Sequence, residues 1–229
     1  MTSDPAHRAA LLASDLFRTM SACEIDAVLA RASVRHVAAG ETILHRGDKS
    51  AGLIVILSGR LRISVVSPEG GEVTLGVLGP GEVLGEISML DGRERSADAQ
   101  TMEAAALLVV DRAHILDVLR RDADLCLRLM AVLCRRLRQA NETVEDIALL
   151  DLQSRVARVL ARLAREFGTP VKGGIRIGPK LSQKDIAMLV GASREKVNRE
   201  LRALEQAGSI AKQDGHLLIV RPRDLEQAG

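Results

Sequence analysis

Aromatic residues are scarce in this 229-residue chain, which has two phenylalanines and neither tyrosine nor tryptophan. Proteins that bind single-stranded nucleic acid stack the bases on aromatic side chains, so the composition argues against that class. The three cysteines, Cys23, Cys126 and Cys134, are an odd and widely spaced set, which argues against a disulfide framework. The sequence also lacks any run of about 18 apolar residues, which argues against a membrane span.

Hydrophobic residues make up 47% of the chain and charged residues 27%. This composition argues against disorder, and the length suits one large domain or two small ones. Residues 1–10 are polar and lack an apolar export segment, so we expect a cytoplasmic protein with no membrane partner. The net charge is +2, and residues 180–229 hold 9 Lys+Arg against 7 Asp+Glu, so the whole excess lies in this segment.

Two helices are predicted near the N-terminus. After Pro5, four apolar residues recur at helical spacing: Leu11, Leu12, Leu16 and Phe17. Ser21 and Glu24 have the spacing of a capping box, which predicts the start of a second short helix.

From about Ser33 to Asp111 the pattern changes to short apolar runs that are separated by glycines. The runs are Thr42–Leu44, Leu53–Leu57, Leu61–Val66, Val73–Leu78 and Ala104–Val110. Pro68–Gly71 is a turn sequence between two of them and predicts a hairpin. Regularly spaced short strands of this kind predict a β-sandwich or barrel.

A long helix is predicted beyond Asp111. The spacing between its apolar residues alternates between four and three positions. These residues are Cys126, Met130, Leu133, Leu137, Ala140, Val144 and Ile147. This is the a/d pattern of a coiled coil. The helix could pack on its own β domain, but a narrow a/d stripe more often meets another helix like itself. We therefore expect a parallel homodimer.

Asp151 is the predicted N-cap of a further helix that ends near Gly168. The buried face of this helix is expected to contain Val156, Val159, Leu160, Leu163 and Phe167. Lys172–Gly174 predicts a loop or small hairpin. We place the domain boundary at Asp151, which gives an N-terminal domain of residues 1–150 and a C-terminal domain of residues 151–229.

The C-terminal domain contains the pattern of a helix-turn-helix. Ser182 is the predicted N-cap of a short helix, Gly191 ends it, and Ser193 caps a second helix. The apolar positions of the two helices are Ile186, Leu189 and Val190, then Val197, Leu201 and Leu204. Ile210–Lys212 and Leu217–Val220, joined by a turn at Asp214-Gly215, read as a β-hairpin, or wing.

The exposed face of the second helix is polar. It carries Arg194, Glu195, Lys196, Asn198, Arg199 and Arg202. The first residues of a recognition helix reach base edges in the major groove, where Arg pairs with guanine and Glu with cytosine. A solvated, salt-bridged face is the alternative, but the cap, turn, apolar positions and wing together favour DNA reading.

A glycine-rich segment, Gly79–Ser88, precedes Arg95-Ser96-Ala97. It does not have the glycine spacing of a dinucleotide-binding loop. Gly85 permits close backbone approach, the residues after it could form a helical turn that favours an anion, and Arg95 could bind that anion. Glu86 could accept from a ribose hydroxyl. The alternative to a ligand site is that this segment is a β-turn with a Glu–Arg ion pair on the surface.

Three features of the sequence occur together: L-G-E-I-S-M-L followed by R-S-A, the long helix, and G-A-S-R-E-K-V-N-R. With these features the chain resembles the cyclic-AMP receptor protein (Crp–Fnr) family of bacterial transcription regulators. The resemblance runs from about Leu16 to Pro222. It implies an α+β fold, with an N-terminal cyclic-nucleotide-binding β-roll (jelly roll), a long dimerisation helix and a C-terminal winged helix-turn-helix. The implied protein is a homodimeric regulator, not an enzyme, with double-stranded DNA, a cyclic nucleotide and RNA polymerase as partners.

The resemblance also implies roles for individual residues. Glu86 would bind the ribose 2′-hydroxyl with help from the Gly85 carbonyl, Arg95 and Ser96 would hold the cyclic phosphate, and Arg136 would brace Glu86. The remaining residues of the implied nucleotide site are Ile87, Ser88, Ala97 and Asn141. Three residues match the family's base readers for a TGTGA half-site: Arg194, Glu195 and Arg199. Four further residues complete the expected DNA-binding set: Ser182, Ser193, Lys196 and Asn198.

One departure from the family concerns the base of the nucleotide. A familiar family member has a Thr-Ser pair on the dimer helix facing the purine, where this chain has Ala140 and Asn141. An amide can pair with adenine or guanine, and Ser96 could contact a syn guanine. We therefore expect cAMP as the first candidate ligand and cGMP as the second.

Other ligands are not expected. An iron–sulfur sensor needs clustered N-terminal cysteines, and only Cys23 lies there. Haem and cupin-like metal sites need positioned ligands, and the five histidines have no ligand spacing. The main alternative is a family regulator that binds DNA without cyclic nucleotide and uses the β-roll for dimerisation only.

Overall fold

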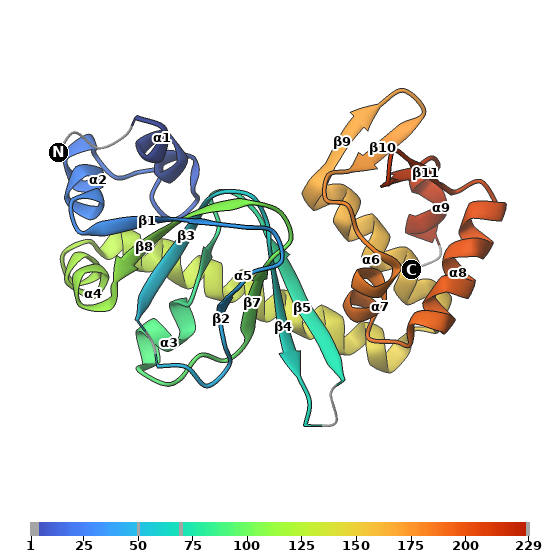
Figure 1. The fold of residues 1–229 in the computed structure, drawn as a ribbon, viewed down its shortest axis with the longest axis horizontal. Coiled ribbons are helices and arrows are strands. Elements are labelled where there is room, and N and C mark those ends of the chain that lie inside the picture. The colour runs from blue at the N-terminus through green and yellow to red at the C-terminus, as the bar shows by residue number, and fades with distance from the viewer. Residues whose placement is uncertain (1–4, 50, 69–70, 228–229) are drawn as a thin grey trace. The chain divides into compact units, whose positions relative to one another are not determined.

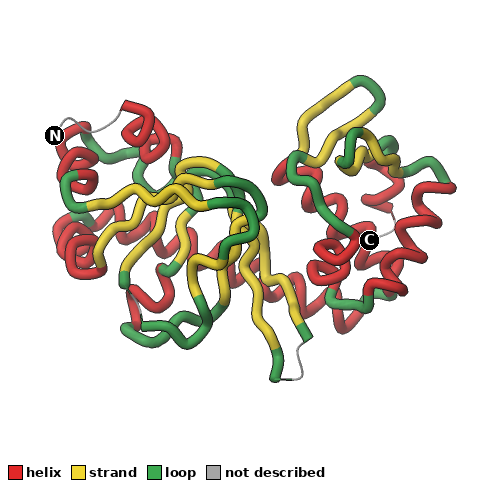
Figure 2. The backbone as a smooth tube through the Cα atoms, viewed as in Figure 1, coloured by secondary structure: helices red, strands yellow, loops and turns green. Residues whose placement is uncertain are grey.

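The computed structural model of the chain describes residues 5–49, 51–68 and 71–227, shown as a ribbon in Figure 1 and as a tube in Figure 2. The chain divides into two compact units. The first comprises Met1–Val65 with Leu75–Arg138, and the second comprises Val66–Thr74 with Gln139–Gly229. Within the described residues, no helix is both long enough and apolar enough to cross a membrane.

The first half of the chain forms two antiparallel four-stranded sheets, β1-β8-β3-β6 and β2-β7-β4-β5. The strands are β1 (Ala32–Val37), β2 (Thr42–Leu44), β3 (Gly52–Ser58), β4 (Leu61–Val66), β5 (Glu72–Leu78), β6 (Val83–Leu84), β7 (Asp98–Thr101) and β8 (Ala105–Asp111). The predicted β domain is thus confirmed, while β1, β6 and β7 were not among the predicted strands. Part of the predicted Pro68–Gly71 turn, residues 69–70, lies outside the described residues.

The central strand β3 is apolar on both faces because each face contacts a different core. Ile54 and Ile56 pack with residues of both sheets, which forms the core between them. Leu53 and Val55 point to the opposite face and pack with helices. Side chains alternate along a strand, so the continuous apolar run Leu53–Leu57 serves both cores.

Five helices belong wholly or partly to the first unit, as far as the described residues extend. They are α1 (Pro5–Ala13), α2 (Ala22–Leu29), α3 (Glu86–Asp91), α4 (Arg112–Arg121) and α5 (Ala123–Leu149). The capping box of α2 is present, with Ser21 and Glu24 bonding each other's backbone N–H groups. The helix predicted to include Leu16 and Phe17 is too long, since α1 ends at Ala13. The side chain of the next residue, Ser14, accepts a hydrogen bond from the Leu16 backbone N–H. A short polar side chain that bonds nearby backbone competes with the helix.

Figure 1 shows the long helix α5 as a ribbon. This helix carries two apolar stripes. Leu125, Leu129 and Val132 are buried in the helix-covered core of the β domain. The second stripe contains the predicted a/d residues, of which Met130, Leu137, Val144 and Ile147 are exposed. Packing on the β domain therefore uses the first stripe and leaves most of the second stripe exposed in a single chain.

The described residues of the second unit contain the end of α5, four further helices and a four-stranded sheet with strand order β11-β12-β10-β9. The elements after α5 are α6 (Leu152–Phe167), β9 (Gly168–Val171), β10 (Gly174–Ile177), α7 (Gln183–Val190), α8 (Arg194–Gln206), β11 (Ile210–Gln213), β12 (His216–Ile219) and α9 (Pro222–Gln227). Asp151 caps α6 as predicted and accepts from the Ser154 N–H at 2.8 Å. The β9–β10 hairpin extends the β11–β12 wing, and α9 was not predicted.

Candidate functional site

A buried carboxylate lies where α3 begins. Glu86, the first residue of α3, has 0% of its surface exposed. Arg136 of α5 donates hydrogen bonds to Glu86 Oε1 and to the Val83 carbonyl. The second carboxylate oxygen, Oε2, is buried and has no hydrogen-bond partner among the described residues. Glu86 therefore retains an acceptor that a donor from outside the chain could use.

Arg95 contacts the same turn and is 4% exposed. Its Nη1 donates to the Gly85 carbonyl at 3.0 Å and to Ser88 Oγ at 2.9 Å, and its Nη2 donates to the Gly52 carbonyl at 2.9 Å. Burial lowers the pKa of Arg95, and nearby carboxylates oppose this shift. Because a guanidinium stays protonated in proteins, the turn has a buried cation beside a buried anion.

Gly85 allows the Arg95 side chain to approach the backbone of this turn closely. It is the N-cap of α3 with a φ of 84°, a left-handed conformation that glycine adopts without penalty. A Cβ at this position would lie 2.1 Å from Arg95 Nη1 and 3.0 Å from the Gly52 carbonyl oxygen. The geometry suits a small molecule with an anionic group and a hydroxyl donor, for which Arg95 and Glu86 are complementary partners.

The structure thus brings Gly85, Glu86, Ser88, Arg95 and Arg136 together. The other residues expected in a nucleotide site lie differently: Ile87 and Ser96 are exposed, Ala97 is half-buried, and Asn141 is exposed on α5. Asn141 is five residues beyond Arg136, about 140° around the helix, so the two residues lie on different faces of α5. The carbonyls of Gly52 and Val83 were not expected, and the sequence contains no signal for them because every residue has a carbonyl.

The helix-turn-helix is formed by α7 and α8. Ser182 and Asp185 make a reciprocal capping box at the start of α7, and Gly191 ends the helix with a φ of 70°. Ser193 occupies the N-cap position of α8, but its side chain makes no capping hydrogen bond. The predicted N-cap position of Ser193 and the start of α8 at Arg194 are therefore confirmed, but the cap lacks a side-chain hydrogen bond. The buried face of α8 is formed by Val197, Leu201 and Leu204, as predicted.

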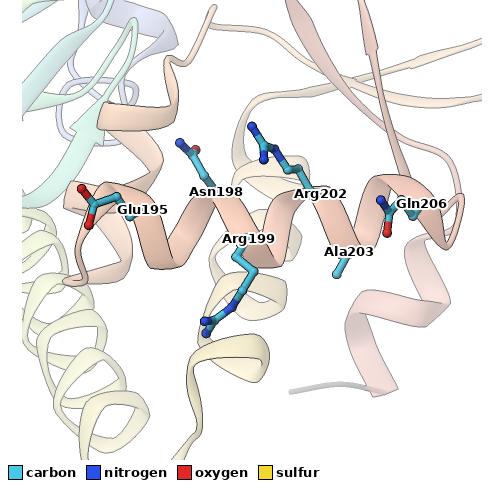
Figure 3. Close-up of a pocket in the computed structure, with 6 residues that line it drawn as sticks. All are labelled: Glu195, Asn198, Arg199, Arg202, Ala203 and Gln206. Carbon is cyan, nitrogen blue, oxygen red and sulfur yellow. The ribbon is translucent and has the colours of Figure 1, made fainter.

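The opposite face of α8 is a polar surface with a shallow hollow. The hollow is lined by Glu195, Asn198, Arg199, Arg202, Ala203 and Gln206 (Figure 3). Arg194 and Lys196 are exposed on the first turn, and Ser182 is exposed at the start of α7. Arg199 Nε donates to Glu200 at 3.2 Å, and Asn198 Oδ1 is buried without a partner among the described residues. A row of cations and amides on an exposed helix is the chemistry that reads duplex DNA.

A metal centre is not evident in the described part of the chain. Residues 5–49, 51–68 and 71–227 contain no group of three or more His, Cys, Asp or Glu side chains that could hold a metal ion.

Family models match two parts of the chain. Residues 34–122 match the cyclic nucleotide-binding domain, and residues 154–228 match the Crp-like helix-turn-helix domain. The fold and these matches define a transcription regulator with a cyclic-nucleotide-binding domain. A CRP-like cAMP-activated global transcriptional regulator of Mycobacterium tuberculosis is 34% identical over 180 residues, which cover 79% of this chain and 80% of the relative. The chain belongs to the Crp–Fnr family.

Two further comparisons agree. The cyclic AMP receptor protein of Thermus thermophilus is 33% identical over 216 residues, covering 93% of this chain and 96% of the relative. The structure of the c-di-GMP responsive global regulator CLP from Xanthomonas campestris has a TM-score of 0.76 at 24% identity, covering 87% of this chain and 99% of that chain. This likeness confirms the predicted fold class. The relatives are transcription regulators, so the family is not one of enzymes.

Proposed function

We propose that the chain is a homodimeric regulator that responds to cAMP, with cGMP as the second candidate, and reads a TGTGA-like palindrome. The observation that carries the proposal is the cluster of Glu86, Arg95 and Arg136, because it links the β domain to α5. In this proposal the boundary near Asp151 separates a nucleotide-binding and dimerisation domain, residues 1–150, from a DNA-binding domain, residues 151–229.

The nucleotide would bind through both charges of the cluster. Glu86 Oε2 would accept from the ribose 2′-hydroxyl, which satisfies a buried acceptor that otherwise costs about 1–3 kcal/mol. Arg95 and Ser96 would hold the cyclic phosphate, with Ile87, Ser88 and Ala97 lining the turn. Arg136 would keep the Glu86 carboxylate in place. The support for this arrangement is that Glu86 is buried and lacks a partner for Oε2 in the described residues.

Isothermal calorimetry with cAMP and with cGMP tests the ligand. We expect tighter binding of cAMP, and a clear preference for cGMP would reverse the order. Glu86→Gln should weaken the binding of both nucleotides, because the amide replaces a charged acceptor. Glu94→Gln, a change of the same charge at an exposed residue, is the matched control and should leave binding unchanged.

The exposed apolar stripe of α5 supports a parallel dimer. Met130, Leu137, Val144 and Ile147 are each more than half exposed in the single chain, and a/d positions of this type pair with a second helix. Asn141 lies on a different face of α5 from Arg136, and in a dimer it would reach the nucleotide of the partner subunit. An amide there can pair with either purine.

The DNA contacts would come from α8. Arg194, Glu195 and Arg199 would read base edges, each good pair being worth roughly 1–3 kcal/mol of discrimination. Two such helices in a dimer would sit about 34 Å apart on a palindrome. Arg199→Ala should remove the preference for the TGTGA palindrome over a shuffled duplex at fixed salt. Unchanged preference in this variant would refute the base-reading assignment.

Nucleotide binding would act on DNA binding through α5. The helix runs without interruption from Ala123 to Leu149 and is followed by the Asp151 cap of α6. Arg136 lies on this helix, so a ligand at Glu86 acts directly on it. A shift of the population from 1:99 to 99:1 needs about 5.5 kcal/mol of preference for the active state, which two nucleotide sites in a dimer could share.

A second candidate is a regulator that binds DNA independently of nucleotide. It is favoured by Arg95, whose two Nη atoms already make three hydrogen bonds within the protein, as expected of a structural residue. DNA affinity measured with and without saturating cAMP or cGMP separates the two candidates. Equal affinity in all three conditions would support the second candidate over the first.

A further inference from the structure

The polar face of α8 continues beyond the residues proposed to read bases. Figure 3 shows Glu195, Asn198 and Arg202 on one side of the helix, whereas Arg199 and Ala203 point to the other side. Arg202 follows Glu195 by seven residues, so the two side chains lie within about 20° of each other around the helix axis. Arg202 is therefore on the same exposed face as Glu195 and Asn198, and it lines the same hollow.

Arg202 lies farther along the helix than the proposed base readers Arg194, Glu195 and Arg199. It lies eight residues beyond Arg194, which is about 12 Å along the axis at 1.5 Å per residue. The major groove is about 12 Å wide, and a recognition helix enters it by its N-terminal end. The Arg202 backbone would then be near the edge of the groove, where the phosphates are.

Arg202 is also chemically available. It is exposed, and it forms no hydrogen bond or ion pair with the described residues. Arg199, by contrast, donates to Glu200 at 3.2 Å. An unpaired guanidinium retains all its donors for a phosphate group.

We propose that Arg202 binds a DNA backbone phosphate at the edge of the major groove and positions α8 without reading sequence. The proposal rests on the proposed function of α8 as the recognition helix. It adds a contact to the DNA-binding set and assigns it a role different from that of Arg194, Glu195 and Arg199.

The salt dependence of DNA binding tests this role, because each neutralised phosphate contributes about −0.9 to the slope of log affinity against log salt concentration. A dimer that loses Arg202 from both subunits should have a slope shallower by about 1.8. When the salt concentration is raised from roughly 50 to 200 mM, the DNA affinity of wild type should then fall by a factor about twelve times larger than that of Arg202→Gln. Fluorescence anisotropy with a labelled TGTGA palindrome and a shuffled duplex, each with and without saturating cAMP, gives both slopes.

Two variants serve as controls. Arg202→Lys keeps a point charge and should restore the wild-type slope, whereas a base-reading arginine needs its two-pronged geometry. Arg165→Gln makes the same charge change on the exposed side of α6 and should leave the slope unchanged. For Arg202→Gln, we expect similar affinity losses on the palindrome and on the shuffled duplex.

An unchanged slope in Arg202→Gln would overturn the proposal, as would an equal change in Arg165→Gln. A loss confined to the palindrome, without rescue by lysine, would make Arg202 a base reader instead. If wild type binds DNA but does not prefer the palindrome, the proposed sequence specificity fails. The slopes on the shuffled duplex still decide the role of Arg202 in that case. If wild type binds neither duplex, both proposals fail.

Discussion

Replacing Gly85 by alanine should destabilise the first unit more than a substitution at any ordinary turn glycine. The new Cβ would lie 2.1 Å from Arg95 Nη1, far inside contact distance, and 3.0 Å from the Gly52 carbonyl oxygen. Arg95 would have to move, and its Nη1 bonds to the Gly85 carbonyl and to Ser88 Oγ would be lost or distorted. The left-handed backbone conformation, with φ of 84°, adds a second penalty.

The two penalties can be separated. A left-handed conformation costs an L-residue about 1–2 kcal/mol, and a hydrogen bond from a charged group contributes about 1.5–3 kcal/mol. With one such bond lost, Gly85→Ala should lower the free energy of unfolding by about 2.5–5 kcal/mol. Gly40 is the matched control, because it has a φ of 81° and no atom lies within 4 Å of the position that a Cβ would occupy there. Gly40→Ala should cost about 1–2 kcal/mol.

The assay is urea unfolding followed by far-UV circular dichroism, since the chain has no tryptophan or tyrosine for intrinsic fluorescence. The two units can unfold in separate transitions, which are then fitted separately. The expected loss belongs to the first unit, which contains both glycines. If Gly85→Ala and Gly40→Ala cost the same, Arg95 is not held against Gly85, and the described geometry of the site is wrong.

Three further substitutions test the exposed a/d stripe of α5, the cap of α6 and the core of the second unit. Leu137→Asp should shift the protein towards monomer in analytical ultracentrifugation, whereas Leu75→Asp, at an equally exposed leucine on β5, should not. Asp151→Ala should lower the thermal stability of the second unit at neutral pH. Hydrogen bonds from Ser154 lower the pKa of Asp151. The contribution of Asp151 to stability is therefore present above its unfolded-state pKa and disappears as the pH falls through the lower, folded-state pKa. The melting temperatures of wild type and variant should converge in acid. Leu160→Ala, at a fully buried residue of α6, should cost about 2–5 kcal/mol in urea unfolding.

Features that depend on neighbouring residues could be predicted from the sequence. The capping boxes of α2 and α7 follow from a serine and an acidic residue three positions later, and the buried face of α8 follows from helical spacing. These patterns work because the interacting groups are one turn apart. The end of α1 was not predictable in this way, because Leu16 and Phe17 are buried from a turn rather than from a helix.

Features that depend on distant residues were harder to predict. The two-residue strand β6 lies inside the glycine-rich segment, and β7 begins with Asp98 and contains Gln100, so neither has the apolar content of a typical strand. The association of Glu86 with Arg136, fifty residues away, came from the family resemblance alone. The Gly52 carbonyl, which binds Arg95, has no side-chain signature at all.

Two faces of α5 explain why a ligand at Glu86 could affect both subunits. Leu125, Leu129 and Val132 fix the helix to the β domain, and Arg136 continues this stripe and holds Glu86. Leu137 is the next residue, about 100° around the helix, and belongs to the exposed a/d stripe. A rigid helix cannot rotate at Arg136 without also moving Leu137. Any rearrangement of the Glu86–Arg136 pair on nucleotide binding would therefore change the packing of the two helices in the proposed dimer.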